Sequence, residues 1–187
     1  AEMSASIEPN RGVARNVIGF IPGNDPQLRD EVIVIGAHYD HLGYGEVGSL
    51  APEPGEIHPG ADDNASGTAA IMELARLLAQ NRDRLKRSVL VIAFSAEEEG
   101  LLGAEYFLRN PTVPRENIVA MLNFDMVGRM TNNRVSISGV GTAAEWEGIL
   151  KAANTGNLNL QLSQSASGGS DHMSFMRREI PVLFFFT

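Results

Sequence analysis

The sequence contains no cysteine, which excludes thiolate metal ligands, a cysteine nucleophile and disulfide bonds. Any bound metal must therefore be held by histidine, aspartate or glutamate side chains. Runs of basic residues are also absent, and the formal net charge at pH 7 is -8. No apolar run approaches the roughly 18 to 20 residues that cross a bilayer. We therefore expect neither nucleic acid nor a membrane among its partners.

The chain has the size and composition of one globular domain, with 187 residues, 43% of them hydrophobic and 20% charged. We expect residues 1–187 to form a single domain. Near-continuous β-branched runs predict three strands that are buried on both faces, at 31–37, 88–96 and 118–124. Outer or shorter strands are expected at 14–21, 134–138 and 180–186, and helices at 65–80, from about 97 to 109, at 143–154 and at 173–178.

Strands that alternate with helices predict an α/β fold, a three-layer αβα arrangement with a mostly parallel, mixed central sheet. Ligands of such sheets bind outside the carboxyl ends of the strands. His38 follows the first of the three buried strands, Glu97 and Glu98 follow the second, and Asp125 follows the third. We therefore expect these four side chains to lie at one edge of the sheet.

The chain is organised around the turn at residues 60–67, which places two adjacent carboxylates, Asp62 and Asp63, just before a helix. Their repulsion costs about 4 kcal/mol at an effective dielectric constant of 20, and a divalent cation would reverse its sign. Simpler interpretations exist: Asp62 as a turn residue, His38 as a core histidine, and Glu97 and Glu98 as first-turn helix acids. Each of these interpretations explains one segment, and none explains why the acidic side chains and the imidazole are expected at the same edge of the sheet.

A nitrogen and oxygen ligand set without sulfur indicates zinc, with cobalt or manganese as substitutes, whereas calcium favours more oxygen ligands. The number of acids suggests two ions, with one carboxylate bridging them. Such a site activates a water molecule and clamps the transition state.

Four motifs, in this order, resemble those of the co-catalytic zinc aminopeptidases, the bacterial leucyl aminopeptidase and aminopeptidase Y family. They are Gly36-Ala-His-Tyr-Asp-His-Leu-Gly43, Gly60-Ala-Asp-Asp-Asn-Ala-Ser-Gly67, Ala96-Glu-Glu-Glu-Gly-Leu-Leu-Gly103 and Asn123-Phe-Asp-Met-Val-Gly128. The resemblance extends from about residue 14 to the end. It implies the zinc-dependent exopeptidase (phosphorylase/hydrolase-like) fold and a catalytic domain.

The resemblance also implies a role for each matching residue. Asp62 corresponds to the carboxylate that bridges two zinc ions, His38 and Asp125 to ligands of one zinc, and Glu98 to a ligand of the other. Glu97 corresponds to the general base and acid. Asp40 corresponds to the carboxylate that orients His38, and a non-proline cis peptide is expected between Asp62 and Asp63.

The reaction implied by the resemblance is release of the amino-terminal residue from a peptide substrate with a free N-terminus. The family also implies a secreted or periplasmic protein. Two alternatives remain: a zinc carboxypeptidase or acyl-transferring cyclase on the same scaffold, and a binding module that has lost catalysis. The presence of Glu97 argues against the binding module.

The family's last zinc ligand is a histidine shortly after the strand expected at 180–186, but this sequence stops at Thr187. We therefore expect a domain that lacks its C-terminal segment, a second zinc ion that is weakly bound or absent, and activity that depends on the missing part. His172 is interpreted as pocket wall and not as a ligand. His41 and His58 are interpreted as loop residues.

Overall fold

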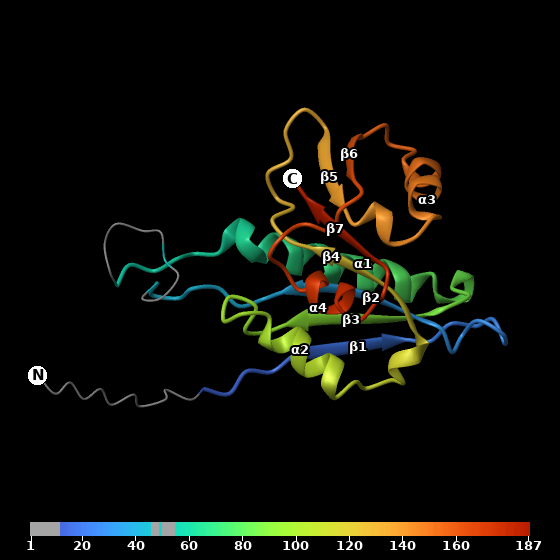
Figure 1. Ribbon diagram of the computed structural model, residues 1–187, viewed down its shortest axis with the longest axis horizontal. Helices are drawn as coiled ribbons and strands as arrows, with labels where there is room; N and C mark the ends of the chain where they lie inside the picture. Colours follow the sequence, from blue (N-terminus) through green and yellow to red (C-terminus); the bar gives the residue numbers. More distant parts are fainter. Residues whose placement is uncertain (1–11, 46–48, 50–54) are drawn as a thin grey trace, which may run out of the picture.

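The computed structural model describes residues 12–45, 49 and 55–187 (Figure 1). Its centre is a seven-stranded sheet with the order β1-β3-β2-β4-β7-β5-β6. The strands are β1 (Val17–Ile21), β2 (Val32–His38), β3 (Ser88–Phe94), β4 (Ile118–Phe124), β5 (Arg134–Ser138), β6 (Asn159–Ser163) and β7 (Val182–Phe186).

The sheet is mixed and mostly parallel, as the sequence predicted. Strand β2 runs parallel to β3 and β4, β4 runs parallel to β7, and β5 runs parallel to β6. Strand β1 lies at one edge, antiparallel to β3, and β5 is antiparallel to β7. The edge strand β6 was not predicted, because its five residues alternate apolar and polar positions over too short a span to be distinguished from a loop.

Helices cover both faces of the sheet and give three layers (Figure 1). They are α1 (Gly67–Gln80), α2 (Leu102–Arg109), α3 (Trp146–Ala153) and α4 (His172–Met176). On one face, α1 packs its buried Ile71 into a cluster with Ile35 and Val89. On the opposite face, α2 and α4 contribute Phe107 and Phe175 to a cluster with Phe94 of β3. The expected αβα architecture is thus present.

The packing of β3 between two layers of helices explains why its sequence is apolar at almost every position. Leu90, Ile92 and Phe94 point to the layer formed by α2 and α4, whereas Val89 and Val91 point to α1. Because successive side chains of a strand alternate between faces, a strand covered on both sides must be apolar at nearly every position.

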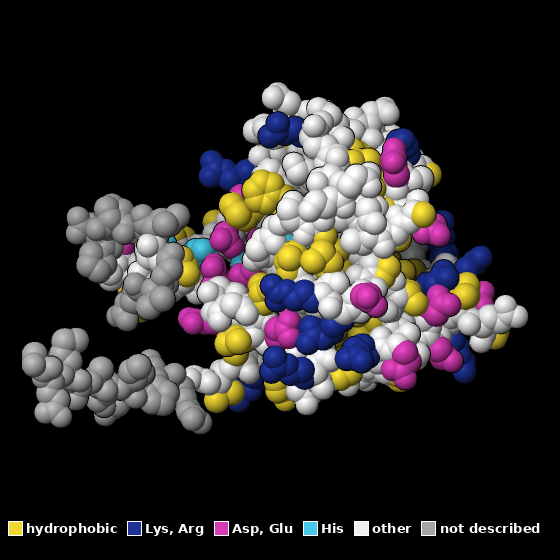
Figure 2. Space-filling view, in the orientation of Figure 1, with side chains coloured by type: hydrophobic (Ala, Val, Ile, Leu, Met, Phe, Trp, Pro, Cys, Tyr) yellow, Lys and Arg dark blue, Asp and Glu magenta, His cyan; other side chains and the backbone are white. Residues whose placement is uncertain are grey.

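The three central strands end at the same level of the sheet. His38 pairs in register with Phe94 of β3, and Gly36 pairs with Asn123 of β4. The residues that follow β2, β3 and β4 are therefore brought to one edge. Figure 2 shows acidic side chains gathered with histidine at one end of the molecule, on the left of the view. None of the described helices is long and apolar enough to cross a membrane.

Candidate metal centre

His38, the last residue of β2, stands at the centre of the site, and only 1% of its side chain is exposed. Its Nδ1 lies 3.1 Å from the carbonyl oxygen of Asp40, to which it donates a hydrogen bond. Its Nε2 faces carboxylate oxygens of Asp63 at 3.2 Å and Asp125 at 3.4 Å. A hydrogen bond at one ring nitrogen orients the other, so Nε2 is positioned to bind a cation.

His38, Asp63 and Asp125 form a group whose ligand atoms all lie within 4.8 Å of one another. Within the described residues, Oδ1 of Asp125 is buried without a hydrogen-bond partner. Leaving a buried carboxylate oxygen without a partner is costly, and a divalent cation is the group that would satisfy it. One imidazole nitrogen and two carboxylates are also the donor set that zinc accepts, so these residues fit the metal that the sequence indicated.

The prediction that Asp62 bridges the metals is wrong. Its Oδ1 accepts a hydrogen bond of 2.8 Å from the backbone N–H of Gly128, so the carboxylate is directed to the loop after β4. The neighbouring Asp63 is the carboxylate that faces His38. Adjacent side chains in this turn point to different sides, and Ser66 helps to fix the turn by accepting a hydrogen bond from the N–H of Val127.

The non-proline cis peptide was also expected one bond too early. It lies between Asp63 and Asn64 and not between Asp62 and Asp63. Asn64 anchors the turn: its Oδ1 accepts the N–H of Gly67 at 2.9 Å, and its Nδ2 donates to the carbonyl of Phe124 at 3.0 Å. This buried asparagine therefore connects the turn to the end of β4, directly before Asp125.

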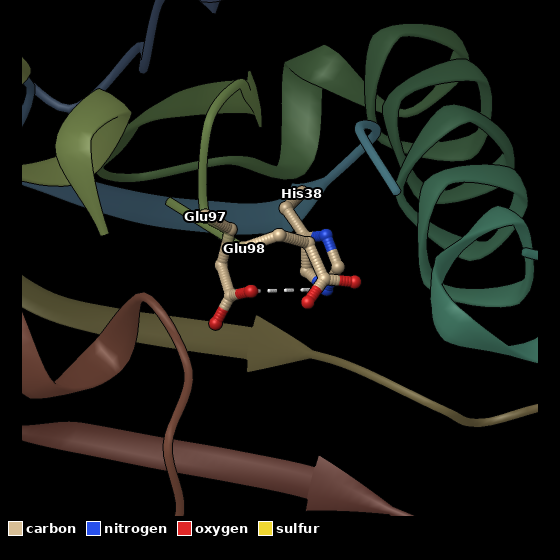
Figure 3. Close-up of side chains that lie close together, drawn as sticks. All are labelled: His38, Glu97 and Glu98. Carbon is tan, nitrogen blue, oxygen red and sulfur yellow. Dashed lines mark ion pairs between the residues drawn. The ribbon is translucent and has the colours of Figure 1, made fainter. Parts of the chain in front are cut away.

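Glu97 and Glu98 come from the turn after β3, and both side chains point into the space beside His38 (Figure 3). The backbone N–H groups of Glu97 and Glu98 donate to the two carboxylate oxygens of Asp40, at 3.2 and 3.3 Å. Asp40 was expected to orient His38 through its carboxylate, but it is the backbone carbonyl of Asp40 that accepts the hydrogen bond from the His38 ring. The Asp40 carboxylate instead fixes the turn that carries the two glutamates. The Glu97 carboxylate is 3.9 Å from Nε2 of His38 and is 8% exposed.

Two non-glycine residues next to the site have left-handed backbone conformations, Ala96 with φ 56° and Met126 with φ 54°. Ala96 precedes Glu97, and Met126 follows Asp125. Such conformations are unfavourable for residues with a Cβ and are concentrated at functional sites. Here they occur where the chain turns sharply away from a strand end to present an acid.

The crowding of acids changes the protonation of the site. Burial raises the pKa of Glu97 to about 7, the opposing charge of His38 lowers it, and the charges of neighbouring acids add to the increase. Burial lowers the pKa of His38, but its interaction with Asp125 and the charges of other acids outweigh this effect and raise it to about 10. Burial, followed by the charges of Asp125 and Glu98, raises the pKa of Asp63. The site therefore retains protons in positions where a cation would replace them.

His41 lies in the loop after β2, as interpreted from the sequence, and this loop brings its ring to the edge of the site. Its Nδ1 is 2.7 Å from Oε1 of Glu98 and 3.9 Å from Oδ2 of Asp63. The available signal was its position three residues after His38, immediately beyond a buried strand. His58, by contrast, bonds through Nε2 to the hydroxyl of Ser49 at 2.9 Å.

Buried polar residues gather at the start of α4, at Ser170, Asp171 and His172. Asp171 and His172 are fully buried, and Ser170 accepts a hydrogen bond of 2.8 Å from Nδ2 of Asn123. The His172 ring stacks on Phe184 at 4.4 Å. No metal-binding group found in the described part of the chain contains His172, in keeping with its interpretation as pocket wall.

Known proteins resemble the chain over nearly its whole length. The sequence model described as Peptidase family M28 matches residues 16–187. The chain is 38% identical over 119 residues to a probable zinc metalloprotease of Leptosphaeria maculans, an alignment that covers 64% of this chain and 26% of that protein. It is 31% identical over 182 residues to leucine aminopeptidase 1 of Ajellomyces capsulatus, covering 90% of this chain and 45% of the relative.

Among solved structures, BSAP, a zinc aminopeptidase from Bacillus subtilis, superposes with a TM-score of 0.69 and 26% identity. This alignment covers 91% of this chain and 39% of BSAP. The chain thus spans less than half the length of each of these three proteins.

Proposed function

Because the chain belongs to Peptidase family M28, we propose that it carries the metal-binding part of a zinc-dependent aminopeptidase, which hydrolyses the N-terminal peptide bond of peptides. The names of the relatives support both the metal and the reaction: a probable zinc metalloprotease, a leucine aminopeptidase and a zinc aminopeptidase. The observation that carries the proposal is the position of Glu97, a nearly buried carboxylate beside the group formed by His38, Asp63 and Asp125.

His38, Asp63 and Asp125 are the residues that would hold zinc, with Asp63 in the place first given to Asp62. When bound, zinc supplies Lewis-acid polarisation of the peptide carbonyl and of a water molecule. The chain itself fixes the ligands, because the Asp40 carbonyl orients the His38 ring and Asn64 anchors the turn that presents Asp63. A site held in this way needs little rearrangement when metal and substrate bind.

Glu97 is the group that moves the proton. Burial keeps its pKa near 7, so its carboxylate accepts a proton from the attacking water and, as the acid, returns it to the leaving amine. Asp40 positions Glu97 through the hydrogen bond from the Glu97 backbone N–H. The backbone at Glu97 is therefore fixed, and from there the side chain reaches to 3.9 Å from Nε2 of His38.

The substrate in this proposal is a peptide with a free, positively charged N-terminus. The carboxylates of Asp63, Glu97, Glu98 and Asp125 meet at one edge of the sheet, and a cationic amine is attracted to such an edge. A blocked N-terminus lacks this charge. Selection of the free amine is thus the property that separates an aminopeptidase from other peptidases on this scaffold.

The experiment compares a peptide with a free N-terminus, its N-acetylated form and its C-terminally amidated form, using the zinc-loaded protein and mass spectrometry of the products. We expect release of the N-terminal residue from the free and amidated peptides, none from the acetylated peptide, and loss of activity on chelation with recovery on zinc addition. Release from the C-terminus would instead support the carboxypeptidase. Binding without cleavage would support the non-catalytic module, and conversion of an N-terminal glutamine without peptide cleavage would support the cyclase.

A further inference from the structure

Asp171 is a buried acid that the metal centre and the proposed mechanism leave without a role. It directly precedes α4 and is fully buried, and within the described residues neither of its oxygens has a hydrogen-bond partner. An ionised carboxylate in such a place is costly, because burial removes its hydration and nothing replaces the lost hydrogen bonds. Such an acid either lies beside a cation or keeps its proton.

The charges around Asp171 favour the protonated form. Burial raises its pKa well above the usual value for an aspartate. The negative charges of three acids raise it further, whereas the charge of one imidazole lowers it; these are the acids Glu97, Asp40 and Asp125 and the imidazole of His38. Among these charged groups, Glu97 has the largest influence.

The described residues offer Asp171 no counter-ion in the zinc-loaded site. Its neighbour His172 is neutral at pH 7, because burial lowers the pKa of that imidazole to about 4. His38 is turned to Asp63 and Asp125 through Nε2, and a metal ion bound there would replace its proton. The same two carboxylates balance the charge of that ion. Nothing among these groups keeps Asp171 ionised.

Asp171 and Glu97 lie on the same face of the sheet. The side chains of His38 and Val34 share a face, since residues four apart in a strand point to the same side, and Val34 belongs to the cluster that contains Phe175 of α4. The Glu97 carboxylate reaches to 3.9 Å from Nε2 of His38 (Figure 3). Glu97 is thus on the side of the sheet that α4 covers, and Asp171 directly precedes that helix.

A hydrogen bond holds the start of α4 against β4. Nδ2 of Asn123 donates to Oγ of Ser170 at 2.8 Å, one residue before Asp171. Oδ1 of Asn123 is buried without a partner, so acceptors are in excess here and a proton on Asp171 would add a donor. Of the acceptors on this face, the Glu97 carboxylate is charged and therefore forms a stronger hydrogen bond than the amide of Asn123.

We propose that Asp171 is a positioning residue for Glu97: it remains a neutral carboxylic acid, and its O–H donates a hydrogen bond to the Glu97 carboxylate. The inference rests on the proposed function, because it concerns the base of that reaction. A donor at one oxygen stabilises the ionised carboxylate and limits its rotation. The other oxygen of Glu97 is then free to accept the proton of the attacking water.

The test uses two spectroscopic readouts on the zinc-loaded protein. Infrared spectroscopy with 13C-labelled aspartate reports the protonation of Asp171, and 13C NMR of labelled glutamate reports the pKa of Glu97. We expect a carboxylic-acid carbonyl band at neutral pH in the wild type and none in Asp171→Asn. Neither readout needs a peptide, so a protein that gives the expected spectra but cleaves nothing would refute only the proposed peptidase activity.

Two substitutions separate a neutral donor from a negative charge. Asp171→Ala removes the donor, so the pKa of Glu97 should rise by about one unit and kcat should fall by about 10- to 100-fold. Asp171→Asn retains an N–H donor and should leave both near their wild-type values. An ionised Asp171 would give the opposite sign, because removing a nearby negative charge in either variant would lower the pKa of Glu97.

Asp83→Asn is the matched control, because it removes a carboxylate that is 98% exposed and should change neither readout. Urea denaturation shows whether each variant folds, and if the alanine variant does not, the infrared band and the asparagine variant still decide. Three results would overturn the proposal: no carboxylic-acid band in the wild type, a lowered or unchanged pKa of Glu97 in Asp171→Ala, or effects of asparagine that equal those of alanine.

Discussion

The backbone N–H of Gly128 donates a hydrogen bond of 2.8 Å to Oδ1 of Asp62. Through this hydrogen bond, Asp62 connects the turn before α1 to the loop after β4. The neighbouring Asp63, and not Asp62, faces His38. The two neighbouring aspartates therefore have different roles that substitution can separate.

Asp63→Asn should abolish zinc binding, because the substitution removes the charge of a carboxylate that belongs to two of the three candidate groups, the one with His38 and Asp125 and the one with His41 and Glu98. Asp62→Asn should leave the zinc affinity within a few-fold and cost no more than about 1 kcal/mol of stability, since the amide oxygen can still accept the Gly128 N–H. Zinc affinity from chelator competition and urea denaturation measure the two effects. The reverse pattern, with zinc lost only in Asp62→Asn, would contradict the assignment.

Glu97→Gln should reduce the turnover rate by about 10²- to 10⁴-fold, the usual contribution of a general base, because the amide cannot accept the proton. Zinc should still bind through His38, Asp63 and Asp125, because that group does not include Glu97, which belongs instead to the group with His38 and Glu98. Steady-state kinetics on an N-terminally free peptide gives the rate, and metal analysis gives the zinc content. Glu99→Gln is the control, because Glu99 is exposed next to the same turn. An unchanged rate in Glu97→Gln would exclude its role as the base.

Asn64→Ala should weaken zinc binding from a position outside the ligand set. The variant leaves the Gly67 N–H and the Phe124 carbonyl without their side-chain partner, which costs about 1 to 3 kcal/mol for each group that stays buried and unpaired. The turn that presents Asp63 then loses its anchor, and zinc affinity should fall by about 10- to 100-fold.

The control for this prediction is Asn110→Ala. Asn110 is exposed and donates to the carbonyl of Tyr106 at the end of α2, far along the chain from the turn. We expect it to change neither zinc affinity nor stability measurably. Equal effects of the two substitutions would show that Asn64 does not position the site.

The metal-free protein should lose stability as the pH rises from neutral to about 10. Burial lowers the pKa of His38, but Asp125 and the other acids outweigh it, so the folded-state pKa is about 10 against 6.5 for an unperturbed histidine. The folded state thus binds this proton more tightly than the unfolded state. Its stabilising contribution is fully present below pH 6.5 and is lost as the pH rises through about 10.

Urea denaturation at a series of pH values, with and without zinc, measures this effect. Zinc should flatten the decline because it replaces the proton on His38, and His38→Gln should flatten it in the metal-free protein. A metal-free wild type whose stability is constant between neutral pH and about 10 would contradict the assignment.

The sequence by itself determined the sheet and the edge at which the chemistry lies. Buried parallel strands have local signatures, because a strand covered on both faces is apolar at nearly every position, as in β2, β3 and β4. His38, Glu97 and Asp125 follow these strands directly in the chain, so locating the strand ends also located the acids and the imidazole. Strand β6 is short and half polar, so it lacks the continuous apolar run of the central strands and was not predicted from the sequence.

Only the tertiary structure decided which side chains enter the site. Asp62 and Asp63 are chemically identical neighbours, and the choice between them depends on how the turn is rotated. That rotation is fixed by two hydrogen bonds between residues about sixty positions apart: Asn64 donates one to the Phe124 carbonyl, and Asp62 accepts the other from the Gly128 N–H. The approach of His41 to Glu98 likewise joins segments that are 57 residues apart. Hydrogen bonds between residues so far apart in the chain produce no periodic pattern in the sequence, because they form only once the strands have assembled.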